Sequence, residues 1–220
     1  MSKTKLLLSG LPNSGKTTLL QTLNNVLVFA RDGKKYPFPQ PHVNVENFDS
    51  ITEVLEMFED KINAYKGAYG KYPETIVIDS ISKLLLDIEG NIVARVKSFP
   101  YGVINTEIKM LMDFIESNLA DNFNVILVSH AMHDKDTDTF NLVNAGGAWG
   151  KKGGVLSEVD QAIFVEIKGK KRVVHLRNPA MAARTTMADM PDKVAGEDFS
   201  LQDHLDELSK SQDTASSFAL

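Results

Sequence analysis

Short runs of consecutive apolar residues alternate with longer amphipathic segments along most of the chain. The strands that this pattern predicts lie at residues 5–9, 26–29, 42–45, 75–79 and 124–128. Apolar side chains recur at helical spacing between them, in the segments 16–24, 51–66 and 104–119. Apolar strands that alternate with helices are typical of a mostly parallel sheet that is flanked by helices. The pattern therefore predicts an α/β fold.

The pattern changes after residue 130. Residues 131–154 are polar and rich in glycine, and we expect them to form a long loop. Two apolar segments, 162–167 and 172–176, flank Gly169-Lys170 and predict a C-terminal antiparallel hairpin. Apolar residues are sparse after residue 195. We therefore expect a core domain at residues 1–190, followed by an acidic tail at 191–220 that is partly helical or disordered.

A glycine-bounded turn follows the first predicted strand. The sequence Gly10-Leu11-Pro12-Asn13-Ser14-Gly15-Lys16-Thr17 has the spacing G-x-x-x-x-G-K-[ST] and precedes a predicted helix. In this strand–loop–helix context the spacing predicts a phosphate-binding loop. Glycine permits close backbone approach, and the N–H groups of such a loop point at the phosphates. The expected nucleotide-binding residues are Gly10, Asn13, Ser14, Gly15, Lys16, Thr17 and Thr18.

The residue types in and beyond this turn indicate ATP and Mg²⁺ as cofactors. Lys16 supplies a flexible positive charge for the outer phosphates, and the Thr17 hydroxyl suits Mg²⁺. Asp79 ends the strand at 75–79, and its carboxylate would orient a water molecule on that ion. The alternative is that Asp79 or Ser80 only caps a helical turn beginning at Ile81. Thr17 and Asp79 are therefore the expected metal-binding residues.

The base that activates the attacking water has to come from elsewhere, because Ser80 rather than an acidic residue follows Asp79. Asp32 lies just past the second predicted strand and is our candidate, with a turn-forming role in Asp32-Gly33 as the alternative. Glu46 is the reserve candidate. His130 ends a strand on the side where parallel strands face the ligand crevice, so it is placed to contact the terminal phosphate. The expected catalytic residues of this group are Lys16, Asp32, Asp79 and His130.

The composition excludes several other kinds of chemistry. The 220 residues contain no cysteine, which excludes disulfides, thiolate zinc sites and cysteine nucleophiles. His130, His133 and Asp134 are spaced closely enough for another metal, but no further ligand cluster supports that alternative. The first apolar run is too short for a signal peptide, and no run reaches membrane-spanning length. We therefore expect a soluble cytoplasmic protein with no membrane partner.

The net charge of −5 does not by itself indicate a partner. The acidic residues are concentrated after residue 188, and the preceding part of the chain is nearly neutral. Any binding to nucleic acid must therefore come from local basic loops.

Together these motifs resemble the core of the RecA-type recombinase ATPases. The resemblance rests on residues 10–18, 75–82 and 125–130, on the loop that Gly146-Gly147 closes, and on the hairpin end at 175–179. It covers residues 4–190 and implies a RecA-like P-loop NTPase fold with ATPase activity. The bare core is similar to the short phage single-strand-annealing proteins of this superfamily. That likeness implies a phage protein acting in the cytoplasm of a bacterial host.

The resemblance also implies two loops that bind single-stranded DNA. The first would span residues 87–103, where basic and aromatic residues are interleaved as Arg95, Lys97, Phe99 and Tyr101. A solvated helix face is the alternative for Arg95 and Lys97. The second loop would span residues 131–148; it carries little positive charge, and Lys151 and Lys152 just beyond it would compensate.

In the RecA-type family a basic residue near the end of the last hairpin reaches the ATP of a neighbouring subunit. Arg177 occupies that position here, and Lys151 lies where a second such residue sits. An arginine delivered in this way stabilises charge in the transition state and makes hydrolysis depend on assembly. The alternative for Arg177 is an ordinary surface arginine. The resemblance thus implies a homo-oligomer, either a filament or a ring, with a single-strand-binding protein as a further partner.

The sequence therefore favours an ATP-dependent, oligomeric single-stranded-DNA-binding protein of recombination or single-strand annealing, with DNA-stimulated ATP hydrolysis. A small P-loop kinase is one alternative, although residues 131–148 hold no arginine for a lid over the transferred phosphoryl group. A non-recombinase ATPase, such as a helicase loader or a packaging motor, is another. The absence of an acidic residue directly after Asp79 disfavours the subclass with an Asp-Glu pair.

Overall fold

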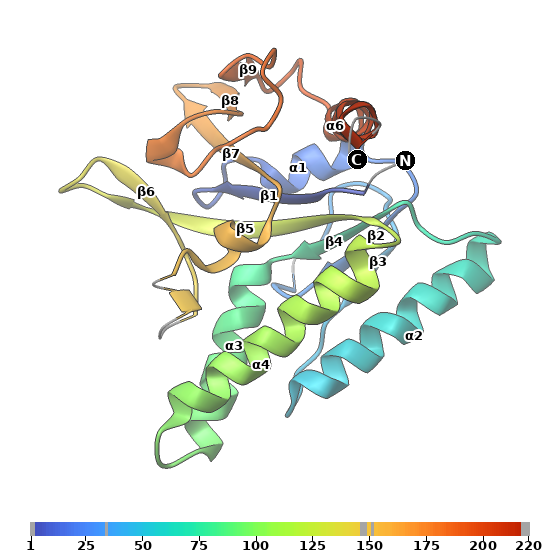
Figure 1. Ribbon diagram of the computed structural model, residues 1–220, viewed down its shortest axis with the longest axis vertical. Coiled ribbons are helices and arrows are strands. Elements are labelled where there is room, and N and C mark those ends of the chain that lie inside the picture. Colours follow the sequence, from blue (N-terminus) through green and yellow to red (C-terminus); the bar gives the residue numbers. More distant parts are fainter. Residues whose placement is uncertain (1–2, 34, 146–148, 151, 217–220) are drawn as a thin grey trace.

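The computed structural model describes residues 3–33, 35–145, 149–150 and 152–216, with residues 212–216 as backbone only. Parallel strands form the centre of the sheet in the order β3-β2-β4-β5-β1-β7 (Figure 1). Their bounds are β1 Lys5–Gly10, β2 Val26–Ala30, β3 His42–Asn44, β4 Thr75–Asp79, β5 Asn124–Asp134 and β7 Gln161–Lys168. The antiparallel strands β8 (Lys171–His175) and β9 (Lys193–Ala195) extend the sheet beyond β7. The predicted α/β fold, a mostly parallel sheet with a C-terminal antiparallel hairpin, is therefore confirmed.

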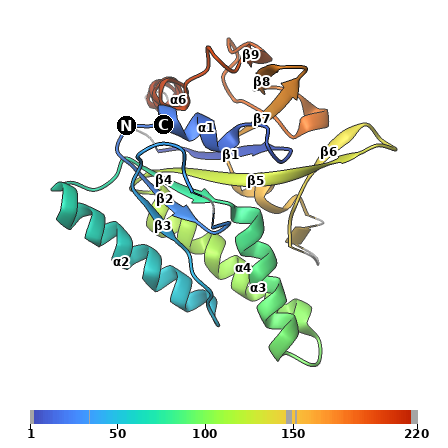
Figure 2. The same cartoon turned by 180° about the vertical axis from the view of Figure 1, so that it is seen from behind.

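Helices cover both faces of this sheet. Figures 1 and 2 show α2 (Ile51–Tyr69), α3 (Ile81–Arg95) and α4 (Pro100–Phe114) on one face, and α1 (Lys16–Leu19) and α6 (Leu201–Ser216) on the other. A 3-10 turn at Leu20–Thr22 extends α1, and a π-helical turn at Ile115–Ala120 extends α4. Further 3-10 turns lie at Gly154–Glu158 and Pro179–Met181. None of the helices in the described ranges is both long and apolar enough to cross a membrane.

The central strands are apolar throughout because each face of the sheet packs on helices. Successive side chains of a strand point to opposite faces, so Leu7 packs toward α2, α3 and α4, whereas Leu6 and Leu8 pack toward α1 and α6. In the first of these layers the ring of Phe29 stacks on that of Phe58 in α2 at 4.2 Å. The sheet therefore separates two apolar layers and fixes which face each helix covers.

The expected start of the second helix is confirmed. Ser50 precedes α2, and its Oγ accepts a hydrogen bond from the backbone N–H of Glu53 at 3.5 Å. The Glu53 carboxylate in turn accepts the backbone N–H of Asp49 at 3.1 Å. These reciprocal bonds satisfy N–H groups that a helix start leaves without partners.

The expected loop at residues 87–103 is wrong. Helix α3 continues to Arg95 and α4 begins at Pro100, so only residues 96–99 separate them. The reason is the apolar stripe of α3, which continues through Ile88 and Ile92, both fully buried. Proline at the first position then favours a new helix, because its missing N–H would have no partner there.

The expected long loop at residues 131–154 is also wrong in its first half. Strand β5 runs on to Asp134 and pairs antiparallel with β6 (Thr139–Leu142). Ala131 is buried, and the Phe140 ring packs against that of Phe164 at 4.9 Å. These contacts hold a hairpin whose polar composition reflects its mostly exposed position. Gly146 and Gly147, expected to close the loop, lie outside the described residues.

The chain after residue 190 contributes to the body of the protein. Strand β9 pairs with β8, and α6 packs on the sheet through buried leucines. Leu201, Leu205 and Leu208 share an apolar cluster with Leu19 and Leu20 at the end of the phosphate-loop helix. The acidic residues Asp203, Asp206 and Glu207 lie on the exposed side of α6, whose opposite side is anchored on the core, and Asp192, Glu197 and Asp198 are exposed in the segment before it.

Helix α6 also buries a titratable group, which makes stability depend on pH. His204 is 3% exposed and its ring lies 5.5 Å from that of Phe199, and burial lowers the pKa of the imidazole to about 4. The unfolded state takes up this proton near pH 6.5 and the folded state only near pH 4. Acidification through this interval should therefore lower the free energy of unfolding by up to about 3 kcal/mol.

The measurement is urea unfolding of the wild type and His204→Leu between pH 7 and pH 4.5. The carboxylates titrate in both proteins, so the difference between the two slopes isolates the imidazole. Identical slopes would contradict a neutral, buried His204.

Candidate nucleotide-binding site

The glycine-bounded turn at residues 10–17, called the phosphate loop below, leaves the carboxyl end of β1. Gly10 has a φ of 153°, and a Cβ there would lie 2.4 Å from the backbone oxygen of Val165 in β7. Gly15 has a φ of 89°, which side chains rarely adopt. The Ser14 N–H closes the turn on the Leu11 carbonyl at 3.2 Å. Glycine is therefore required at both ends of the loop. At Gly10 there is no space for a side chain, and at Gly15 the backbone conformation excludes one.

Lys16 lies inside the loop rather than in solvent. It is 6% exposed, and its Nζ donates hydrogen bonds to the carbonyls of Gly10 and Leu11, each at 2.9 Å. The ammonium group is thus held at the mouth of the turn by two loop carbonyls. This arrangement suits the outer phosphates of a nucleotide.

Neighbouring strand ends complete a cavity of about 270 Å³ around this loop. Because β5 lies between β1 and β4, Asp79 at the end of β4 and His130 within β5 both lie near the phosphate loop. Gly10 pairs directly with His130. The cavity is lined by Asn13, Gly15, Lys16, Thr17, Thr18, Asp79 and His130. Seven of the expected site residues are therefore brought together. Gly10 forms the base of the loop, and Ser14 is 3% exposed.

Asp79 is the centre of the polar contacts in this cavity. It is 3% exposed, and its Oδ2 accepts hydrogen bonds from Tyr36 Oη at 2.8 Å and from Thr17 Oγ1 at 3.5 Å. Burial and the charge of Asp79 raise the pKa of Tyr36 well above its usual value, so the phenol stays protonated and remains a donor. Asp79 is therefore fixed by two hydroxyl groups that come from different parts of the chain.

The residues in the cavity fit Mg-ATP. The Thr17 hydroxyl and the Asp79 carboxylate lie next to each other, 3.5 Å apart. Oxygen donors of this kind suit Mg²⁺, which keeps water and phosphate oxygens as its other ligands. The buried Oγ of Ser14 has no hydrogen-bond partner among the described residues, so it is available to a phosphate oxygen. The metal ion, when bound, neutralises charge on the phosphates; Thr17 and Asp79 would hold it, and Lys16 would contact the phosphates.

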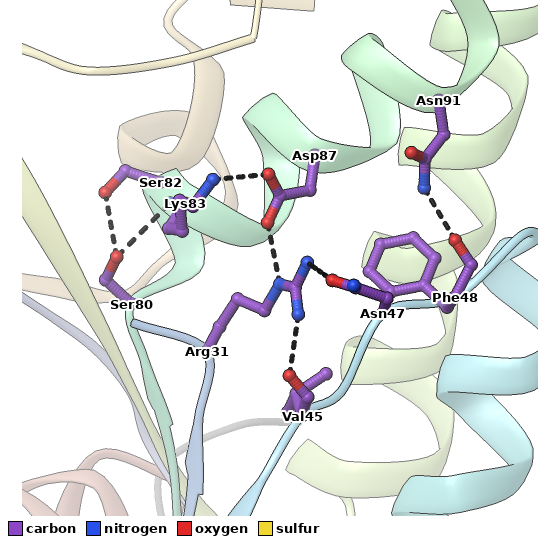
Figure 3. A network of polar contacts seen from close by, with 9 residues as sticks. All are labelled: Arg31, Val45, Asn47, Phe48, Ser80, Ser82, Lys83, Asp87 and Asn91. Atoms are coloured by element: carbon purple, nitrogen blue, oxygen red, sulfur yellow. Dashed lines mark hydrogen bonds and ion pairs between the residues drawn. The ribbon is translucent and has the colours of Figure 1, made fainter. Parts of the chain in front are cut away.

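A buried ion pair holds the strand ends in place, and Figure 3 shows its contacts. Arg31, which follows β2, donates from Nε to Asp87 of α3 at 2.6 Å and from Nη1 to the Val45 carbonyl at 2.7 Å. The side chains of Arg31 and Asp87 are only 12% and 16% exposed. The Arg31 backbone N–H also donates to the Asp79 carbonyl at 2.6 Å. The end of β2 is thereby tied to both Asp79 and α3.

The two serines after Asp79 extend this network toward His130. Ser80 caps α3 and accepts the N–H of Lys83 at 3.2 Å, as the alternative interpretation of this position expected. Ser82 Oγ donates to Ser80 Oγ at 3.3 Å and accepts the backbone N–H of His130 at 3.2 Å. The start of α3 is therefore joined directly to β5 at His130.

Asp32 and Glu46 do not line the cavity. The charge of Asp32 contributes to the raised pKa of Tyr36, which places its carboxylate near the Tyr36–Asp79 pair. Glu46 is exposed in the segment between β3 and α2. The assignment of Asp32 as the water-activating base, with Glu46 in reserve, stays a prediction.

The other expected site residues lie away from the cavity. Arg177, just past β8, donates to Asp192 at 3.3 Å and to the Met187 carbonyl at 3.1 Å.

The expected DNA-binding residues also lie outside the cavity lining. Arg95 bonds the Asp49 carbonyl and pairs with Glu107, whereas Lys97 is exposed and bonds the Ala94 carbonyl. Phe99, Tyr101 and Lys152 are exposed; Lys151 lies outside the described residues.

The histidine-rich alternative for a metal receives no support. His133 pairs with Asp138 at 2.9 Å and stacks on Phe140 at 4.7 Å. Within the described ranges, no group of three or more His, Asp or Glu side chains is arranged to hold a metal ion.

Two residues of this region escaped the sequence analysis. Tyr36 lies in a proline-rich segment with no periodic pattern, and only the folded loop brings its hydroxyl to Asp79. Arg172 lies within the predicted hairpin, and only the register of β7 and β8 places it at the phosphate loop. In both cases the signal is a distance between segments far apart in the chain.

These features define the class of protein. A glycine-bounded loop between a buried parallel strand and a helix, with its lysine and threonine facing a buried aspartate, is the nucleotide site of a P-loop ATPase. The sequence profile of a family described as "AAA domain" matches residues 2–185, and the chain belongs to that family. A search of curated proteins found no match. The family establishes a P-loop ATPase domain, which implies nucleotide and usually Mg²⁺ as cofactors.

Replacing Lys16 by alanine should weaken ATP binding by about ten- to a hundredfold, the range typical for loss of a hydrogen bond to a charged group. Titration with a fluorescent ATP analogue measures the affinity. Lys61→Ala on the exposed side of α2 removes the same charge and serves as the control. Wild-type affinity in Lys16→Ala, with an unchanged circular dichroism spectrum, would contradict the phosphate-loop assignment.

Replacing Tyr36 by phenylalanine should raise the Mg²⁺ concentration needed for half-maximal ATP hydrolysis about tenfold, because partners that orient a ligating carboxylate typically affect metal affinity to this extent. Nucleotide binding in the presence of a chelator should not change. Tyr72→Phe is the matched control, since the hydroxyl of Tyr72 bonds only Asn63 at 3.5 Å among the described contacts. An unchanged Mg²⁺ dependence would show that Tyr36 does not position Asp79.

Proposed function

We propose that this chain is an ATP-dependent, oligomeric single-stranded-DNA-binding protein of the RecA type that serves recombination or single-strand annealing. Its ATPase activity would then be stimulated by DNA. The observation that carries the proposal is the projecting tip of the α3–α4 pair, which presents aromatic side chains to solvent.

The tip consists of residues 93–103, where α3 ends, four residues connect, and α4 begins. Figure 1 shows that it points away from the sheet. Phe99 is 90% exposed and Tyr101 59% exposed, and Lys97 lies beside them. Phe99 also has a φ of 53°, which is uncommon for an aromatic residue. Aromatic rings next to a basic side chain suit single-stranded nucleic acid, because every base can stack on such a ring.

A cavity of about 430 Å³ extends this surface along α4. Tyr101, Asn105 and Lys109 follow one another at four-residue spacing and so share one side of the helix. The cavity is lined by Asn105, Lys109, Met112, Asp113, Trp149, Lys152 and Glu158. Asn105 Oδ1 is buried and has no hydrogen-bond partner among the described residues. Together, Trp149, Asn105 and Lys152 suit a nucleobase. Since Lys109 is paired with Asp113, base stacking rather than net charge would provide most of the affinity.

The start of α3 connects this surface to the nucleotide cavity. Helix α3 begins two residues after Asp79, and Ser82 in its first turn accepts the N–H of His130. Any shift of Asp79 or His130 toward a bound nucleotide would therefore act on the helix that carries the tip. This connection supports a DNA affinity that depends on ATP.

Arg177 supports the oligomeric part of the proposal. It lies at the end of the terminal hairpin, with its side chain 44% exposed, and would enter the ATP site of a neighbouring subunit. A homo-oligomer with shared sites, as a filament or a ring, follows from that role, and a single-strand-binding protein remains a further partner. The kinase alternative is weaker, because the β5–β6 hairpin beside the cavity contains no arginine.

Replacing Phe99 by alanine should weaken binding to single-stranded DNA about tenfold, within the range measured for loss of one stacked base. The measurement is fluorescence anisotropy of a labelled oligonucleotide with and without a non-hydrolysable ATP analogue. Tyr69→Ala at the end of α2 removes another exposed aromatic ring and serves as the control.

Wild-type protein should bind the oligonucleotide more tightly with the analogue than without it. Negligible binding in both conditions would overturn the proposed function. Binding that Phe99→Ala leaves unchanged would overturn the assignment of the tip.

A further inference from the structure

The hairpin of β7 and β8 brings a second cationic side chain to the phosphate loop. Strand β7 runs parallel to β1, with Val165 opposite Gly10, where β1 ends. It continues two residues further to Ile167, which pairs with Arg172 on β8. Arg172 is therefore level with the phosphate loop, on the side of β1 opposite to Asp79.

The guanidinium of Arg172 lies directly against Gly15. A Cβ on Gly15 would come within 2.6 Å of Arg172 Nε and 2.8 Å of Nη2. On its other side, a Cβ on Gly196 would lie 2.6 Å from both Cγ and Cδ of Arg172. The Gly196 N–H donates to the Arg172 carbonyl at 2.9 Å and keeps this close approach in register. Two glycines thus provide the space through which the arginine reaches the loop.

The charge of this arginine is not used within the described part of the chain. Its Nε is buried and has no hydrogen-bond partner there, and no carboxylate of the described residues pairs with the guanidinium. A buried N–H donor that loses its water contact without gaining an acceptor is unfavourable. A phosphate would supply both negative charge and acceptor oxygens, which the planar guanidinium binds in pairs.

We propose that Arg172 is a nucleotide-binding residue that contacts phosphate oxygens of the ATP bound in its own subunit. Asp79 and Thr17 lie on one side of the loop, and Arg172 approaches from the other. Arg172 differs in this respect from Arg177, which lies beyond the end of β8 and is turned to Asp192. The inference rests on the nucleotide site alone and does not require DNA binding.

The test is titration of a fluorescent ATP analogue, with Mg²⁺ and without DNA, against folded variants of the full chain. Arg172→Ala should weaken binding about tenfold or more, and Arg172→Lys should weaken it less, because charge is kept while the paired donors are lost. Lys171→Ala is the matched control, since it removes one positive charge from the preceding, exposed position of β8 and should bind normally.

A second variant tests the position of the side chain rather than its charge. Gly196→Ala retains Arg172 but places a methyl group against its stem, so it should weaken ATP binding in the same direction. Combined with Arg172→Ala it should cause no further loss, because the displaced group is already gone. Thermal melting of each variant separates loss of binding from loss of folding.

Each outcome decides the inference. Wild-type affinity in a folded Arg172→Ala variant would overturn it, and so would tighter binding, because the arginine would then occupy the place of the phosphates. If Lys16→Ala also binds normally, the nucleotide site itself is wrong. If only the Arg172 variants bind normally, the nucleotide site stands and Arg172 has no part in it.

Discussion

The parallel pairing of β1 with β5 on one side and β7 on the other is the constraint on which the whole site depends. Pairing in this order places the carboxyl ends of β4, β5 and β1 along one edge of the sheet. It also brings the Val165 carbonyl so close to Gly10 that a side chain there would collide with it. The phosphate loop can leave the sheet only because glycine stands at this position. A cavity with a lysine, an aspartate and a histidine around it follows from the strand order.

The polar residues at this edge are held by contacts that would be costly to break. Arg31 and Asp87 form a mostly buried ion pair, and removing one partner of such a pair typically destabilises a protein by about 3–5 kcal/mol. The same arginine bonds the backbone of Asp79 and Val45, so the ion pair also sets the relative position of three segments. Charged side chains at this edge of the sheet therefore hold one another in position.

Features that a local pattern encodes could be predicted from the sequence. The phosphate loop has a fixed spacing between a strand and a helix, and the buried strands are apolar over their whole length. The expected helix at 51–66 begins at Ile51 as α2, and its Ser50–Glu53 cap likewise depends on residues three apart. The loops expected at residues 87–103 and 131–154 were wrong, because polar and glycine-containing composition suggested them where helices and strands form. Ile88 and Ile92 of α3 and the packing of Phe140 on Phe164 outweighed that composition, because buried apolar contacts contribute more than local preference.

By itself, the sequence determined that the chain builds a parallel α/β sheet with a phosphate loop after its first strand, since spacing and periodicity encode both. Only the tertiary structure decided which distant side chains meet there. Tyr36 reaches Asp79 from a segment 43 positions earlier in the chain, and Arg172 reaches Gly15 from the far end of the domain. The reason is physical: side-chain direction and strand register are fixed by how the layers pack, and packing depends on all the buried residues at once.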